Sequence, residues 1–236
     1  MLRHRIFNEL SELFSPLTCL ICQKSGSELC DRCEKLIVRF KSARHLPLSQ
    51  QEKDTVLPIW PAAVASHELT KIILLAKEMN IRRARNYLAH LLVESYMRAE
   101  ADQGNPGPIS LIPIPSSLRA NRQRGYKHSY ELANALRTAL LPHVKREVFV
   151  SDLLRVNRPV ADQSGLGRAE RIANLHGAYS VVNPRSALPQ PQSGELTLYL
   201  MDDLMTTGSS LQEGFRALTE AGFRPSGALV AGASAA

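Results

Sequence analysis

The feature that most constrains the fold of this chain is the segment Leu198–Leu211, where an apolar run meets two acids and a loop of small residues. The run, Leu196–Met201, has the length and composition of a strand that is buried on both faces, as in a parallel sheet. Asp202 and Asp203 follow where this strand is expected to end. Apolar residues then recur at helical spacing, at Leu211, Phe215 and Leu218. This order of strand, loop and helix predicts an α/β protein with a parallel sheet.

The loop between the predicted strand and helix combines a glycine with hydroxyl side chains. It comprises Thr206, Thr207, Gly208, Ser209 and Ser210. Loops at the carboxyl ends of strands bind ligands in open α/β sheets, and a helix N-terminus offers unpaired N–H groups to an anion. The ionised carboxylates of Asp202 and Asp203 only accept hydrogen bonds, so they suit a diol or a metal ion better than a phosphate. The combination predicts a site for a sugar phosphate.

The same segment resembles the phosphoribosyl pyrophosphate (PRPP) motif of type I phosphoribosyltransferases. In that motif, four apolar residues, two acids, an apolar residue and any residue precede Thr-Thr-Gly-x-Ser/Thr, and Leu198–Ser210 matches at every position. The resemblance implies a type I phosphoribosyltransferase fold that binds PRPP with Mg²⁺ through the acid pair and the loop. The alternative is a strand–turn–helix unit that carries two acids without such a site.

The four cysteines of the chain form two C-x2-C pairs near the N-terminus. They are Cys19, Cys22, Cys30 and Cys33. Two such pairs bring four thiolates to one tetrahedral ion, which predicts a structural zinc site that is closed to substrate. A disulfide framework is the weaker alternative because nothing indicates an oxidising compartment. A catalytic dithiol does not explain two pairs.

Composition and charge limit the class of protein. The chain has 236 residues, an apolar content of 44% and a formal net charge of +7, which permits nucleic-acid or polyphosphate partners. Arg3 and Arg5 begin no secretory segment because Glu9 and Glu12 interrupt the apolar residues after them. No apolar run has membrane-spanning length. We therefore expect a cytoplasmic protein without membrane insertion.

The predicted organisation is an N-terminal module and a larger domain. Residues 1–60 are expected to hold a short helix over 6–14, the zinc module and a connector over 41–58, with strand pairing near 56–60. Residues 61–236 are expected to form the phosphoribosyltransferase-like domain. Within it, apolar stripes predict one helix from Glu68 to Asn80 and a second ending near Ala99. The basic run Arg82–Arg85 is interpreted as a solvated helix start or turn.

A second strand with a polar loop at its carboxyl end is predicted at Ile109–Ile114. The loop and the basic segment after it offer hydroxyl and cationic groups: Ser116, Ser117, Arg119, Arg122, Arg124 and Lys127. We expect these residues to close over a pyrophosphate, since Arg and Lys pair well with phosphate oxygens. One alternative is a merely solvated basic loop. Another is a nucleic-acid surface on which Tyr126 stacks a base.

Across most of its length the chain resembles the ComF/GntX family of the phosphoribosyltransferase superfamily. The matching segments are Cys19–Cys33, Pro113–Pro115, Arg124–Tyr126, Gln163–Asn174 and Leu198–Ser210. The chain departs from the pattern at Lys127-His128, where many relatives carry Asn-Gln, and at the Pro/Ser/Gln-rich insertion over 183–194.

The resemblance implies two classes of function. The first is a PRPP-binding protein that assists DNA uptake in natural competence, with single-stranded DNA and a helicase-like protein as partners. GntX-type members are linked instead to gluconate utilisation. The second is an active phosphoribosyltransferase, for which the sequence shows no acceptor pocket. Purine-salvage relatives carry an acid where this chain has Thr206, which disfavours 6-oxopurine acceptors. A fold that has lost both activities is the remaining alternative.

Overall fold

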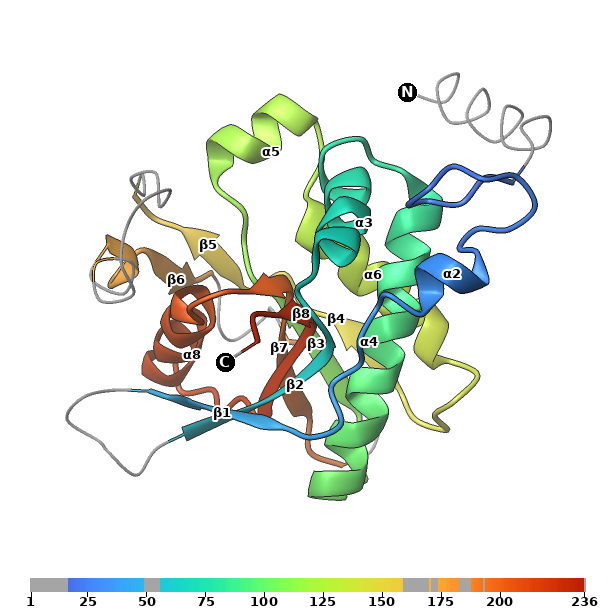
Figure 1. Ribbon diagram of the computed structural model, residues 1–236. Coiled ribbons are helices and arrows are strands. Elements are labelled where there is room, and N and C mark those ends of the chain that lie inside the picture. Colours follow the sequence, from blue (N-terminus) through green and yellow to red (C-terminus); the bar gives the residue numbers. More distant parts are fainter. Residues whose placement is uncertain are drawn as a thin grey trace.

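The structure is a computed structural model that describes residues 17–48, 56–158, 170, 174–182, 188–192 and 194–235 (Figure 1). The side chains of Leu118 and Arg119 are also outside the description. The helix expected over 6–14 and most of the Gln163–Asn174 block lie outside the described residues. No helix in the described ranges is both long and apolar enough to cross a membrane.

A six-stranded sheet forms the centre of the fold, in the order β1-β2-β8-β7-β3-β4. Its strands are β1 (Arg44–Pro47), β2 (Val56–Val64), β3 (Ile109–Pro113), β4 (Val148–Val150), β7 (Thr197–Met205) and β8 (Gly227–Ala233). Among the described strands of this sheet, β1 and β2 pair antiparallel and the other neighbours pair in parallel. The strands β5 (Leu154–Val156) and β6 (Tyr179–Val181) form a separate antiparallel pair. The predicted α/β class with a mostly parallel sheet is confirmed.

Helices and the small hairpin cover the two faces of the sheet (Figure 1). The helices are α2 (Asp31–Glu34), α3 (His67–Lys77), α4 (Arg82–Gln103), α5 (Leu118–Arg124), α6 (His128–Leu140) and α8 (Ser209–Glu220). One apolar cluster joins α3, α4 and α6 to the sheet, and a second joins α8, β5 and β6 to it. The side chains of β7 alternate between these clusters: Tyr199 and Met201 lie in the first, Leu198 and Leu200 in the second. This alternation confirms that the apolar run is buried on both faces.

Strand β7 is longer than predicted, and the acid pair lies within it rather than after it. The strand runs to Met205 because β8 continues to pair with it through Leu204 and Met205. On its other side, pairing with β3 stops at Met201. Asp202 and Asp203 therefore lie beyond the last residue pair with β3 but are still held by β8. The apolar periodicity of one strand carries no information on how far its neighbour extends.

The other predicted elements agree with the structure within a few residues. The strand pairing expected near residues 56–60 is confirmed by β2, and the helix stripes correspond to α3 and α4. The connector over 41–58 contains β1, which pairs with β2. Strand β2 runs through residue 60 without a break, and a domain boundary at that residue remains a proposal.

Candidate functional site

The second acid of the pair is buried between two basic side chains. Asp203 Oδ2 lies 2.9 Å from Nζ of Lys77, the last residue of α3, and 3.3 Å from Nε2 of His128, the first residue of α6. The Asp203 side chain is only 5% exposed. Its backbone N–H donates a 2.9 Å hydrogen bond to Oδ1 of Asp202, which keeps some exposure. Two helices, α3 and α6, thus converge on the end of β7.

The two carboxyl groups have opposite pKa shifts. Burial and the neighbouring Asp203 charge raise the pKa of Asp202 well above its ordinary value. Burial would also raise the pKa of Asp203, but the His128 imidazole and the Lys77 ammonium outweigh it and hold that pKa below its ordinary value. These shifts favour a state in which Asp203 carries a negative charge and Asp202 does not.

The loop after β7 turns sharply into α8. Gly208 has φ of 80°, in the left-handed region that favours glycine, and an added Cβ would lie 2.6 Å from Leu46 Cδ1 of β1. Helix α8 then begins at Ser209 without a side-chain cap from Gly208, although the Ser209 N–H donates a long hydrogen bond of 3.5 Å to Thr207 Oγ1. The hydroxyls of Thr207 and Ser209 lie 3.0 Å apart. Backbone N–H groups at the start of an uncapped helix are suited to an anion. The turn therefore favours glycine, and a larger residue there would also displace the Leu46 side chain.

The structure separates the cations that we expected around a pyrophosphate. The Arg124 side chain is only 5% exposed and pairs with Glu78 at 3.1 Å, whereas Lys127 pairs with Asp152 at 2.7 Å. Arg122 is exposed. The hydroxyl of Ser117 accepts from the N–H of Ala120 and caps α5, and the Ser116 carbonyl accepts from Asn121. The described cations of this segment therefore point to different neighbours.

The Tyr126 hydroxyl donates to the carbonyls of Ala76 and Lys77 at the end of α3. This contact ties the Tyr126 hydroxyl to the end of α3, and the alternative in which the ring stacks on a base remains a prediction. Residues Arg82–Arg85 occupy the first turn of α4, as the interpretation of a helix start requires. Of these, Arg85 donates to Asn80 and Arg83 to the Thr18 carbonyl.

Three residues at the site had no signal in the sequence pattern that marked them as functional. Lys77 appeared as an ordinary member of a predicted helix and His128 only as a departure from the family pattern, although both approach Asp203 from positions far away in the chain. Tyr179 of β6 is buried, and its phenol interacts with Ser210 and with the charge of Asp202. Burial and the Asp202 charge raise the pKa of this phenol. The sequence pattern does not show which residues these three side chains meet in the folded protein.

The four cysteines form a compact cluster, as predicted from their spacing. Their sulfur atoms all lie within 4.8 Å of one another, and no two of them form a disulfide. Sγ atoms of Cys22 and Cys30 are 3.6 Å apart, close to the separation of about 3.8 Å that Zn–S bonds of about 2.3 Å produce in a tetrahedron. The donor set and its dimensions fit a zinc ion bound by four thiolates.

The cysteine module packs against α3 and α4 through polar contacts. Lys71 of α3 donates to the Ile21 carbonyl, and Tyr87 of α4 donates to Glu34 of α2. Arg39 bridges Glu34 and Glu94 at 2.6 and 3.0 Å. These contacts attach the module to the same helices that form one layer of the main sheet.

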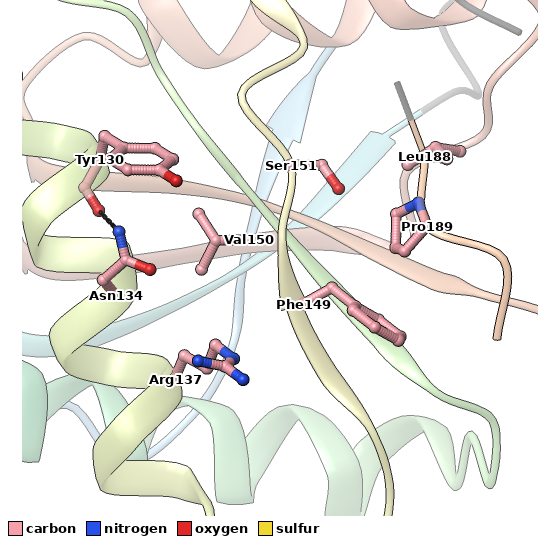
Figure 2. Close-up of a pocket in the computed structure, with 8 residues that line it drawn as sticks. All are labelled: Tyr130, Asn134, Arg137, Phe149, Val150, Ser151, Leu188 and Pro189. Atoms are coloured by element: carbon pink, nitrogen blue, oxygen red, sulfur yellow. Dashed lines mark hydrogen bonds between the residues drawn. The ribbon is translucent and has the colours of Figure 1, made fainter. Parts of the chain in front are cut away.

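Two pockets lie near the open edge of the sheet. The first, of about 390 Å³, is lined by residues of α6 and β4 and by Leu188 and Pro189 (Figure 2). It contains none of the predicted site residues. The second, of about 130 Å³, lies between the β3–α5 turn and β5 and includes Ser116 and Lys127 among its lining residues. Tyr130 contributes to both.

Comparison with known proteins gives one distant relative. No protein-family model matches the chain. The chain is 25% identical over 218 residues to Competence protein F of Haemophilus influenzae, and the aligned region covers 85% of this chain and 90% of that protein. Coverage this broad, together with the cysteine cluster, supports the ComF family as the group to which the chain is related.

Proposed function

We propose that this chain is a ComF-like protein that binds PRPP with Mg²⁺ beside the acid pair of β7 and serves DNA uptake. The observation that carries the proposal is that Asp202 and Asp203 lie near the carboxyl end of β7, where the chain turns into the start of α8. The similarity to a protein named Competence protein F supports the proposed role in DNA uptake. The type I phosphoribosyltransferase fold is part of the same proposal.

Each group has a distinct part in the proposed complex. Thr206–Ser210 would hold the 5′-phosphate, and Asp202 would accept from the ribose hydroxyls while Asp203 remains engaged with Lys77. The pyrophosphate would face the hydroxyls of Ser116 and Ser117 and the cationic side chains of the next segment. The four cations of this proposal are Arg119, Arg122, Arg124 and Lys127. Arg124 and Lys127 would have to leave their pairs with Glu78 and Asp152 to take part. Bound Mg²⁺ would supply positive charge that neutralises the phosphate oxygens.

The zinc part of the proposal is structural. Four thiolates complete a tetrahedral shell, so zinc held by Cys19, Cys22, Cys30 and Cys33 would have no open position for substrate. Its role would be to order the module that packs on α3 and α4. Single-stranded DNA and a helicase-like protein are the proposed macromolecular partners, and the net charge of +7 is compatible with the first.

Catalysis of phosphoribosyl transfer is the second candidate function. The observation that favours it is the 130 Å³ pocket next to the acid pair, because a transferase needs room for an acceptor beside the sugar. In this function the basic side chains would stabilise the charge of the leaving pyrophosphate.

Calorimetric titration of the full chain with PRPP and Mg²⁺ tests the proposed site. We expect binding to the parent and a loss of about tenfold in affinity when Asp202 and Asp203 are both changed to Asn in a protein that remains folded, since hydrogen bonds at the two positions are weakened and each contributes about 0.5–1.5 kcal/mol. Glu131→Gln is the matched control, because it removes a carboxylate charge at an exposed position of α6. Equal affinity of the parent and the double variant would remove the acid pair from the site.

A further inference from the structure

The pocket of about 390 Å³ lies at the outer edge of the sheet, away from the acid pair (Figure 2). Strand β4 is the last strand of the sheet on this side, and β3 separates it from β7. Part of the wall is formed by Leu188 and Pro189, which belong to the insertion over 183–194 that departs from the family pattern. A ligand in this pocket would therefore be separate from a ligand at the acid pair.

Three side chains reach the pocket from one face of α6. Tyr130, Asn134 and Arg137 are four and three residues apart, which places them in a row along the helix. Figure 2 shows all three projecting from α6 toward β4. With a rise of about 1.5 Å per residue, the row spans about 10 Å. The pocket therefore offers an aromatic ring, a carboxamide and a guanidinium group in that order.

Arg137 is held in place by the backbone of the edge strand. Its Nε donates a 2.8 Å hydrogen bond to the carbonyl of Val148. The carbonyl one residue earlier, that of Glu147, accepts instead from Ile109 of β3, so the Val148 carbonyl is on the outer side. Arg137 covers this outer carbonyl, which disfavours the addition of a further strand. In the described part of the chain its two terminal amines have no acidic partner, so they can bind a phosphate with two hydrogen bonds.

The carboxamide of Asn134 presents a hydrogen-bond donor beside an acceptor. One Nδ2 proton is used by the Tyr130 carbonyl at 3.1 Å, which orients the group. The second Nδ2 proton and Oδ1 have no other partner among the described residues, so they can meet a ligand. Adenine presents N7 as an acceptor beside its N6 amino donor, and Asn pairs with these two groups through two hydrogen bonds. A carboxamide at this position therefore matches the edge of an adenine base.

Aromatic and apolar side chains supply surface for the plane of a base. Tyr130 and Phe149 both line the pocket and are both half-buried, and Leu188 and Pro189 lie beside Phe149 in Figure 2. The volume of about 390 Å³ is near the lower end of the range of about 300–1,000 Å³ for ligand pockets, which suits one nucleotide. No carboxylate is among the described residues that line the pocket, so a phosphate would meet no like charge there.

From these features we infer that this pocket binds an adenine nucleotide. The phosphate lies on Arg137, the base edge on Asn134 and the base plane against Tyr130. The nucleotide can be free or part of a single strand, and both present the same base edge and phosphate. The inference goes beyond the proposed function and does not rest on it, since the pocket contains none of the residues of the sugar phosphate site.

The test is titration of the full chain with dAMP and with dTMP for five proteins. These are the parent, Arg137→Gln, Asn134→Leu, Asp202→Asn and the control Arg82→Gln, which removes the same charge at an exposed position of α4. We expect dAMP affinity to fall about tenfold in Arg137→Gln and to stay within severalfold of the parent in Arg82→Gln and Asp202→Asn. The parent should prefer dAMP to dTMP by about tenfold, and Asn134→Leu should lose this preference.

The loss of preference in Asn134→Leu decides the matter even if Arg137→Gln fails to fold, because a ratio of two affinities of one folded protein does not depend on its stability. Titration with oligo(dA) distinguishes the sources. Binding of oligo(dA) that depends on Arg137 indicates a nucleotide within a strand, whereas binding of dAMP alone indicates a free nucleotide.

Three results would overturn the inference. They are a parent that does not bind dAMP, equal dAMP affinity in the parent and in a folded Arg137→Gln protein, and equal affinity of the parent for dAMP and dTMP. Loss of dAMP binding in Asp202→Asn but not in Arg137→Gln would also overturn it, since the nucleotide would then lie at the acid pair. A parent that binds dAMP through Arg137 but does not bind PRPP supports the pocket and contradicts the proposed function.

Discussion

Nζ of Lys77 lies 2.9 Å from Oδ2 of Asp203, although 126 residues separate the two in the chain. The ammonium comes from the last turn of α3 and the carboxylate from β7. This ion pair makes the two acids of the motif unequal, because it occupies Asp203 and leaves Asp202 with the raised pKa. The first two predictions concern this difference.

Changing Asp203 to Asn should destabilise the fold more than changing Asp202 to Asn. The first change leaves the Lys77 ammonium opposite a neutral amide in a largely buried position, and breaking buried pairs costs about 3–5 kcal/mol. Asp202 has no cation within salt-bridge distance in the described part of the chain, so we expect a smaller effect. Urea denaturation of both single variants measures the difference, and equal destabilisation would contradict this account of the pair.

The pH dependence of stability should also distinguish the acids. Because the folded state raises the pKa of Asp202, its contribution is present below the ordinary Asp pKa of about 3.9 and is lost as pH rises through the folded value. Asp203 behaves in the opposite way, and its contribution is lost as pH falls below that ordinary value. Asp202→Asn should therefore gain stability relative to the parent as pH rises from about 4 to about 8. Denaturation at several pH values tests this, and a constant difference would contradict it.

The cysteine cluster should contain about one zinc ion per chain. Cys22 is the best position to change, because its side chain is exposed and contributes little packing of its own. In Cys22→Ser, zinc content should fall well below one per chain. The melting temperature should fall by about 8–16 °C, since loss of a structural metal is among the changes that cost more than about 4 kcal/mol.

Elemental analysis and thermal denaturation measure both effects of the zinc prediction. Lys24→Ser is the control, since it changes an exposed residue of the same loop without removing a thiolate. A parent protein that is fully folded and free of metal would refute the zinc assignment.

Substitutions of Arg122 and Arg124 should affect DNA binding and stability differently. Arg122 is exposed, so Arg122→Gln should leave stability within about 0.5 kcal/mol of the parent. If Arg122 contacts a phosphate of single-stranded DNA, this change should reduce the slope of log affinity against log salt by about 0.7. Arg124→Gln should destabilise the protein by about 0.5–3 kcal/mol, because it removes the packing of a side chain that is only 5% exposed.

Filter binding or fluorescence anisotropy at several salt concentrations measures the slopes. The two variants are matched, since each replaces an arginine of α5 by glutamine. A DNA affinity that depends neither on salt nor on Arg122 would argue against the nucleic-acid role, and it would leave the PRPP site as a separate question.

Glu213 should be essential for attaching the β5–β6 hairpin to α8. Its side chain is 3% exposed, accepts from the N–H of Tyr179 and pairs with Arg216 at 2.7 Å. Glu213→Gln should cost about 3 kcal/mol. Glu220→Gln is the matched control, because Glu220 pairs with the same Arg216 but is 67% exposed, and surface pairs contribute less than about 1 kcal/mol. Thermal denaturation measures the loss of stability in both variants. An equal loss in Glu213→Gln and Glu220→Gln would contradict the claim that burial makes the Glu213 pair the stronger one.

Local pattern was enough to predict several elements of this fold, but not β1, α5 or the β5–β6 pair. The unbroken apolar run at Leu196–Met201 required a strand covered on both faces, and its side chains do alternate between two apolar clusters. The spacing of the cysteines required a small cluster, because each C-x2-C pair can present two sulfurs to one ion. Both properties depend on residues that are close in the sequence, so periodicity and spacing reveal them.

Only the tertiary structure decided which groups meet at the end of β7. The strand extends to Met205 because β8 pairs with it there, and Asp203 is charged because Lys77 and His128 reach it from two other elements. The same packing turns Arg124 toward Glu78 and Lys127 toward Asp152, although the sequence places all four cations of that segment together. Side-chain neighbours from distant segments are set by how the layers pack, and the composition of one segment does not contain that information.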